Sequence, residues 1–138
     1  MNTTLVRSLS LVVLFSVLAV SSRADATAHA QIIKEREAVL SEIVSYQESL
    51  FATGTADEAA VTSAHLALRT FRRDTAATVA EKIKQQESIV QAYEKNLATV
   101  KTRMNTGLGT RFDFLTATDV LLQAKQLLEE LKLNEKKS

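Results

Sequence analysis

Few side chains in this 138-residue sequence combine the type and the spacing that chemistry at a site requires. The two histidines, His29 and His65, have no cysteine and no pair of carboxylates at ligand spacing beside them. Zinc is held in proteins by several Cys, His or carboxylate ligands, so these residues do not form a pattern that binds metal. We expect both histidines to lie on helix surfaces, and we predict neither a metal site nor a cofactor.

The acidic and hydroxyl side chains do not form a catalytic pattern. Asp113 and Asp119 are six residues apart, on different faces of a helix, and cannot share a proton as an acid/base pair. Ser and Thr are numerous, but no base is placed to activate any of them. The segment GLGT, residues 107–110, lacks the lysine and the preceding strand of a phosphate-binding loop. We therefore predict that the protein is not an enzyme.

Three arginines, Arg69, Arg72 and Arg73, share one side of a helix at spacings of three and four residues. Such a cluster has two interpretations. It binds an acidic partner, or it forms a solvated face whose charge Asp74 partly balances. We expect the solvated face.

The first 26 residues have the pattern of a secretory signal peptide. Arg7 lies in a short polar start, an apolar run covers Leu9–Val20, and an A-x-A arrangement ends at Ala26. The apolar run is too short for a spanning helix, and an uncleaved anchor is the alternative. The prediction is a signal peptide over 1–26 and a helical domain over 27–138, periplasmic or secreted, without a membrane span in the mature chain.

The composition favours thin helical packing and limits the classes of partner. The chain has no proline, no cysteine and three glycines, and only 5% of its residues are aromatic. Loss of Arg7, Arg23 and Asp25 with the signal peptide leaves equal numbers of basic and acidic groups. Electrostatics therefore give no reason to expect nucleic acid or anionic membrane surfaces as partners. Secretion without disulfides fits a bacterial periplasm.

Apolar residues at helical spacing predict three strongly amphipathic segments. In the last two, the apolar steps alternate between four and three residues, as in a coiled coil. The first segment, Gln31–Ala52, has on one face Ile32, Val39, Leu40, Ile43, Tyr46 and Leu50. The second has Val79, Ile83, Gln86, Val90, Tyr93, Leu97, Val100 and Met104. The third has Phe114, Ala117, Leu121, Ala124, Leu128 and Leu131.

The first two segments are joined by a further helical stretch that contains Val61, Ala64, Leu68 and Phe71. Because nothing in the following RRDTAA forces a break, we prefer one helix from Ala56 to Met104, roughly 70 Å long at 1.5 Å per residue. The alternative is a new helix capped by Asp74 or Thr75. That break would fold the rod into a four-helix bundle.

The glycines mark two helix-to-helix turns. Gly54 ends the first helix, and Gly107 and Gly109 end the second, because a left-handed residue is common at a helix C-terminus. Thr110 is expected to cap the final helix, with Asp113 completing a capping box. A shift of 53 residues superimposes Gly54 on Gly107 and Leu68 on Leu121, which indicates two related hairpins in tandem, with chance similarity of amphipathic helices as the alternative.

The second turn and the helix after it, RMNTGLGTRFDFLTATDVLLQAKQLL, resemble the tunnel-helix hairpin tip of TolC-type outer-membrane efflux proteins. In that family a long helix ends in a basic residue and a Gly-Leu turn, and the next helix opens with Asp, an apolar residue and then Ala. The residues at matching spacing are Arg103, Asn105, Gly107, Leu108, Asp113, Phe114 and Ala117. The resemblance covers roughly Val90 to Leu131 and only the helical tunnel repeat.

The resemblance implies a layout in which one long central helix is flanked by two shorter helices, Gln31–Ala52 and Thr110–Leu133. Protomers of the family assemble as a trimer into a periplasmic tunnel whose tips meet the hairpins of an adaptor protein. By resemblance, Gly107 and Leu108 form a docking tip, and Arg103 and Asp113 flank it. Full-length members carry two such repeats, so this chain is not expected to form a channel alone.

We predict an all-α protein of elongated antiparallel coiled-coil hairpins in tandem, associated with envelope efflux or transport through protein docking at the tip. The alternative is a stand-alone periplasmic helical chaperone or scaffold without an export role. An apolar flank outside the seams, Leu115, Leu122 and Leu127, predicts a homo-oligomer or a partner helix.

Overall fold

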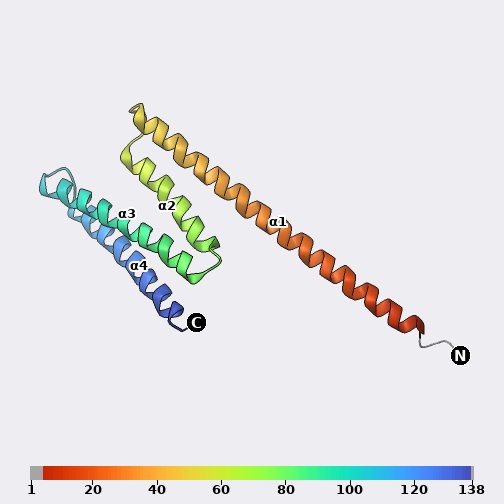
Figure 1. Cartoon of the computed structure of the whole chain (residues 1–138). Coiled ribbons are helices and arrows are strands. Elements are labelled where there is room, and N and C mark those ends of the chain that lie inside the picture. The colour runs from red at the N-terminus through yellow and green to blue at the C-terminus, as the bar shows by residue number, and fades with distance from the viewer. Residues whose placement is uncertain (1–4, 138) are drawn as a thin grey trace. The chain divides into compact units, whose positions relative to one another are not determined.

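The computed structural model describes the backbone of residues 5–137 and the side chains of residues 26–137. This part of the chain forms four helices and no strand: α1 (Leu5–Ala52), α2 (Glu58–Thr75), α3 (Val79–Asn105) and α4 (Arg111–Glu135) (Figure 1). The predicted all-α fold class is confirmed. The predicted signal peptide lies, apart from Ala26, outside the residues whose side chains are described. No helix in the described part of the chain is long and apolar enough to cross a membrane.

The chain divides into two compact units, Met1–Ala38 and Val39–Ser138. The first contains the N-terminal part of α1, where Gln31 Nε2 donates to Glu35 Oε1 across one helical turn at 2.8 Å. The second contains the rest of α1 with α2, α3 and α4. Both hydrophobic clusters of the protein's described part lie in this second unit.

The predicted continuous helix from Ala56 to Met104 is wrong, and with it the layout of one long central helix between two shorter ones. α2 ends at Thr75, and the next residue, Ala76, has an extended backbone with φ −62° and ψ 137°. α3 begins only at Val79. Contacts between α2 and α3 pair residues at similar distances from this break, so the two helices are antiparallel neighbours.

A capping box at the start of α3 favours the break between α2 and α3. Thr78 is the N-cap of α3: its hydroxyl accepts a hydrogen bond from the Glu81 N–H at 3.2 Å, and Glu81 Oε2 accepts one from the Thr78 N–H at 3.2 Å. This arrangement satisfies two of the N–H groups that a helix start leaves unpaired. The cap lies beyond Asp74 and Thr75, which were the predicted alternatives. The local sequence TVAE carried the signal for it.

The first hairpin packs α1 against α2 through a narrower face than predicted. Val44 of α1 is buried with Ala64 and Leu68 of α2, and Leu40 packs beside them. Of the predicted face of the first helix, Leu40 and Leu50 are half-buried, whereas the remaining members are exposed: Ile32, Val39, Ile43 and Tyr46. The apolar stripe of this helix is wider than one neighbour covers, and α2 contacts only one edge of it.

The second hairpin packs α3 against α4, and its buried residues come from the predicted seams except for Ile89, which was not predicted. The buried residues are Ile89, Val90, Leu121, Ala124 and Leu128, with Ile83, Tyr93 and Leu97 packed against them. Two exposed ion pairs, Lys125–Glu94 at 2.8 Å and Lys132–Glu87 at 3.7 Å, follow the same antiparallel register. Exposed ion pairs contribute little stability, so burial of the apolar seam is the main interaction that stabilises the hairpin.

One polar side chain, Gln86, lies inside this packing and is only 1% exposed. Its Nε2 donates to the Ala124 carbonyl of α4 at 2.8 Å, and its Oε1 accepts from Arg73 Nη1 of α2 at 2.8 Å. Arg73 in turn pairs with Asp74 at 2.7 Å. Gln86 therefore connects three helices, and its hydrogen bonds offset the cost of burying an amide.

We predict that Gln86→Ala lowers the free energy of unfolding by about 2–4 kcal/mol. The substitution removes two buried hydrogen bonds and leaves a cavity among packed helices. Urea unfolding followed by circular dichroism measures the change. Gln91→Ala, an exposed glutamine on the same helix, is the matched control and is expected to stay within about 0.5 kcal/mol of the parent. Equal effects of the two substitutions would contradict a structural role for Gln86.

Candidate functional site

Hydrogen bonds fix the backbone of the turn between α3 and α4 at the end of α3 and at the start of α4. α3 ends in a Schellman motif: Leu108 N–H donates to the Arg103 carbonyl at 2.8 Å, and Gly107 N–H donates to the Met104 carbonyl at 3.1 Å. Gly107 has φ +75°, in the left-handed region that glycine adopts without a Cβ penalty. The predicted helix end at Gly107 is confirmed.

Gly109 has a different role in the same turn. A Cβ at this position would lie 3.2 Å from the backbone nitrogen of Met104 and 3.3 Å from the Cβ of Arg103. Glycine here allows the returning chain to pass close to the end of α3. The sequence reasoning placed both glycines in the turn, but it assigned them one common cause.

The predicted capping box at the start of α4 is confirmed. Thr110 is the N-cap, its hydroxyl accepts from the Asp113 N–H at 3.1 Å, and Asp113 Oδ2 accepts from the Thr110 N–H at 2.9 Å. The Thr110 hydroxyl also donates to Asp113 Oδ2 at 2.7 Å. These side-chain and backbone hydrogen bonds, with a smaller contribution from the charge of Arg103, hold the pKa of Asp113 below its ordinary value.

The tip that these motifs fix exposes two large apolar side chains. Leu108 is 74% exposed and Phe112 is 76% exposed. Arg103, at the end of α3, is exposed as well. The structure thus places Arg103, Gly107, Leu108 and Asp113, the predicted tip residues, in one turn.

Phe112 was missed in the sequence reasoning. The neighbouring Phe114 belongs to the heptad seam and is half-buried, whereas Phe112 lies outside every predicted seam. Two residues along a helix correspond to roughly 200° of rotation, which puts Phe112 on the opposite side from Phe114. That spacing was the signal that could have identified it.

The flank of α4 that was predicted to bind a partner helix is open at two of its three positions. Leu115 is 53% exposed and Leu122 is 58% exposed. Leu127 is half-buried beside the buried Leu128. The exposed part of the flank lies nearer the tip than the end of the hairpin.

The two glycine turns, at Gly54 and Gly107, have the same construction, as the predicted repeat requires. At the first turn, Thr55 N–H donates to the Leu50 carbonyl at 2.8 Å and Gly54 N–H donates to the Phe51 carbonyl at 2.9 Å, which is again a Schellman motif. Gly54 has φ +72°. The N-cap of α2 is Asp57, which stands three residues after Gly54 as Thr110 stands after Gly107.

The remaining candidate residues serve the packing of α2. Arg69 and Arg73 do not form the predicted solvated face, because Arg69 Nη1 donates to the Ser88 carbonyl of α3 at 3.1 Å and Arg73 binds Gln86. His65 lies on a helix surface as expected, and its Nε2 is 2.9 Å from Glu48 Oε1 of α1. Glu48 comes from another helix, so the local sequence around His65 gives no signal of this pair.

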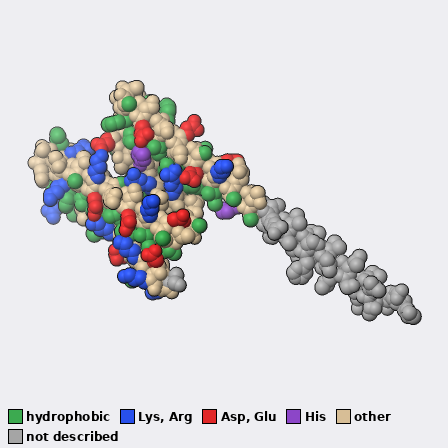
Figure 2. All heavy atoms as spheres, in the orientation of Figure 1, with side chains coloured by type: hydrophobic (Ala, Val, Ile, Leu, Met, Phe, Trp, Pro, Cys, Tyr) green, Lys and Arg blue, Asp and Glu red, His purple; other side chains and the backbone are tan. Residues whose placement is uncertain are grey.

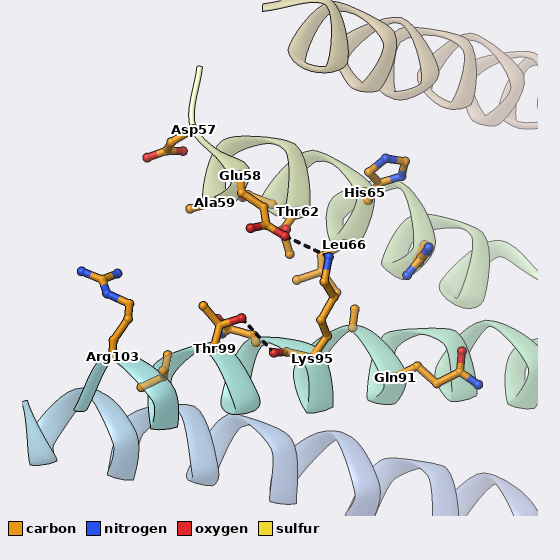
Figure 3. Close-up of a pocket in the computed structure, with 15 residues that line it drawn as sticks. Asp57, Glu58, Ala59, Thr62, His65, Leu66, Gln91, Lys95, Thr99 and Arg103 are labelled. Atoms are coloured by element: carbon orange, nitrogen blue, oxygen red, sulfur yellow. Dashed lines mark hydrogen bonds and ion pairs between the residues drawn. The ribbon is translucent and has the colours of Figure 1, made fainter. Parts of the chain in front are cut away.

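A groove of about 690 Å³ lies between α2 and α3 (Figure 3). Several charged groups on its walls have partners within the fold: Glu58 pairs with Lys95 at 2.9 Å, His65 meets Glu48, and Arg69 meets the backbone of α3. In the described residues no three His, Cys, Asp or Glu side chains lie together as the ligands of a metal ion would.

Acidic and basic side chains are interspersed over the face shown in Figure 2, with hydrophobic side chains between them. A large patch of a single charge is not present on this face, so it offers no surface for recognition by net charge alone. The apolar residues of the tip and of α4 are the features that point to a partner. Comparison with known proteins finds no family model, curated protein or solved structure that matches this chain.

We predict that the cap at the start of α4 weakens only in acid. Asp113 has a folded pKa below its unfolded value of about 3.9. Its charged form is therefore the form that folding favours, and its contribution to stability is present above about pH 4 and is lost as the pH falls through the folded pKa. Asp113→Asn abolishes this acid-dependent step. Carboxyl NMR titration and amide exchange at residues 110–113 measure it.

Asp119→Asn is the matched control, because Asp119 accepts a hydrogen bond from Gln123 in the middle of α4 and takes no part in the cap. This variant should retain the acid-dependent loosening of residues 110–113. An Asp113 carboxyl that titrates at or above pH 3.9, or a step that survives in Asp113→Asn, would contradict the assignment.

Proposed function

We propose that the protein is a non-enzymatic periplasmic docking protein whose α3–α4 tip binds a helical hairpin of a partner protein. The observation that carries the proposal is the exposure of Leu108 in the α3–α4 turn and of Phe112 in the first turn of α4. Phenylalanine is enriched in protein interfaces, and exposed apolar surface marks interaction sites. Their neighbours supply charges of both signs, Arg103 and Asp113, which suit a polar rim around an apolar centre.

The fixed backbone of the tip supports a binding role. The Schellman motif and the capping box join α3 to α4 with backbone hydrogen bonds on both sides of Leu108. A segment that is already ordered loses little conformational entropy when it binds. An exposed apolar pair on such a turn is therefore well prepared for a partner.

The association with envelope efflux or transport rests on the resemblance of the tip sequence to TolC-type proteins. The break between α2 and α3 removes the long central helix of that family's tunnel repeat from the folded chain. We therefore propose that this chain shares tip docking with the TolC-type family, and that the chain with α2 folded back on α3 does not form the family's tunnel. Adaptor-type helical hairpins are the class of partner that the resemblance implies.

A second function, that of a helical chaperone or scaffold without an export role, is favoured by the exposed helix faces. Val39, Ile43 and Tyr46 of α1 and Leu122 of α4 offer apolar surface away from the tip, and Leu115 adds exposed apolar surface closer to it. A scaffold that binds unfolded or envelope proteins needs extended apolar faces of this kind. The two functions differ in which residues they require.

We predict that a photoreactive benzoylphenylalanine in place of Phe112 crosslinks to one discrete partner in the periplasm. Adding Leu108→Asp should reduce this crosslink at least tenfold, because a buried leucine contributes about 2 kcal/mol at an interface and a carboxylate opposes burial. Circular dichroism should show unchanged helicity, since Leu108 is outside both hydrophobic clusters.

Leu122→Asp is the matched control on the exposed flank of α4 and should leave the crosslink intact. The opposite pattern, with crosslinks to many proteins that persist in Leu108→Asp and are lost in Leu122→Asp, would replace tip docking with the scaffold function.

A further inference from the structure

The four helices have two separate hydrophobic clusters, one in each hairpin. Val44, Ala64 and Leu68 form the cluster between α1 and α2. The cluster between α3 and α4 is formed by Ile89, Val90, Leu121, Ala124 and Leu128. From α2, only the half-buried Leu66 is packed against the second cluster. Each hairpin therefore carries its own apolar seam.

Three polar contacts join the hairpins, in addition to the packing of Leu66 against the second cluster. Arg73 binds Gln86, Arg69 donates to the Ser88 carbonyl, and the Lys95 ammonium pairs with Glu58. Figure 3 shows the last of these pairs crossing the groove between the two helices. These contacts require an α2 and an α3 that face each other, and they do not depend on the two helices belonging to one chain.

The segment that joins the hairpins is short and contains no glycine or proline. It consists of Ala76, Ala77 and Thr78, between the end of α2 and the start of α3. Alanine is the strongest helix former. α2 also ends without a left-handed residue, and the Ala76 N–H makes only a long hydrogen bond, at 3.4 Å, to Arg73. The capping box of Thr78 and Glu81 is thus the main local feature that favours the break.

We propose that two copies of the chain exchange hairpins. In the exchanged dimer residues 76–78 become helical, α2 and α3 form one continuous helix, and the α1–α2 hairpin of each copy packs on the α3–α4 hairpin of the other. The second copy then supplies the same Arg73–Gln86, Arg69–Ser88 and Lys95–Glu58 contacts that the closed chain makes with itself. Exchange of an identical element costs little beyond the hinge, and short hinges promote it.

Two substitutions in residues 76–78, the hinge between the hairpins, should shift the monomer–dimer equilibrium in opposite directions. Ala77→Pro should reduce the dimer at least tenfold, since proline is excluded from a helix interior, while Ala76 already has the extended backbone that a residue before proline prefers. Thr78→Ala removes the cap of α3 and should tighten the dimer about tenfold. Light scattering coupled to size exclusion, over a range of concentrations of protein purified from cells that express the full chain, measures both.

Thr110→Ala is the matched control. It removes the equivalent capping residue at the tip turn, where Gly107 still ends α3, and should leave the monomer–dimer equilibrium unchanged. If Thr110→Ala and Thr78→Ala raise the dimer equally, general destabilisation rather than the hinge controls association, and the proposal fails.

Crosslinking identifies which helices meet between copies. The chain has no cysteine, so Glu58→Cys and Lys95→Cys each introduce a single thiol at an exposed position. A short bis-maleimide added to a mixture of the two single variants, refolded together, should join them across the dimer and fail to do so when both carry Ala77→Pro. A strict monomer at all concentrations, or a dimer that Ala77→Pro leaves intact, would overturn hairpin exchange.

Discussion

The amide of Gln86 is the interaction on which the arrangement of the helices depends. It lies in the seam between α3 and α4, whose core is an apolar cluster, and it binds one group on α4 and one on α2. A buried amide without partners would be costly, so the packing is favourable only when α2 brings Arg73 to it. The polar group therefore selects one register among the several that apolar heptads allow.

This register has consequences for the tip. Because α2 folds back along α3, the α3–α4 hairpin is supported on one side, and its far end projects Leu108 and Phe112 from a turn closed by hydrogen bonds. The same construction recurs at Gly54, but there Thr55 and Asp57 replace the exposed leucine and the threonine cap. The repeated turn is a structural unit, and the apolar pair is what distinguishes the second copy of it.

Periodicity and capping chemistry were sufficient to predict the all-helical fold, most of the seam between α3 and α4, both glycine turns and the Thr110–Asp113 box, but not the buried Ile89. The break before Val79 was not predicted: the apolar stripe weakens across RRDTAA, but this segment contains no glycine or proline that would force a helix to end. Its causes are the Thr78–Glu81 box and the long-range contact of Arg73 with Gln86, which is thirteen residues away. Neither Phe112 nor the Glu48–His65 pair follows from a seam, since an exposed residue leaves no periodic signal and a partner on another helix is not local.

The most direct test of this account is the distance between spin labels at residues 58 and 95, measured by pulsed electron resonance on the monomer fraction. Lys95 Nζ lies 2.9 Å from Glu58 Oε1, so labels at these sites should be within about 25 Å of each other once their linkers are included. A continuous helix through residues 76–78 would instead separate them by roughly 55 Å. We predict the short distance in the unmodified monomer. In Gln86→Ala the distance should become longer or its distribution broader. The long distance in the unmodified monomer would contradict it.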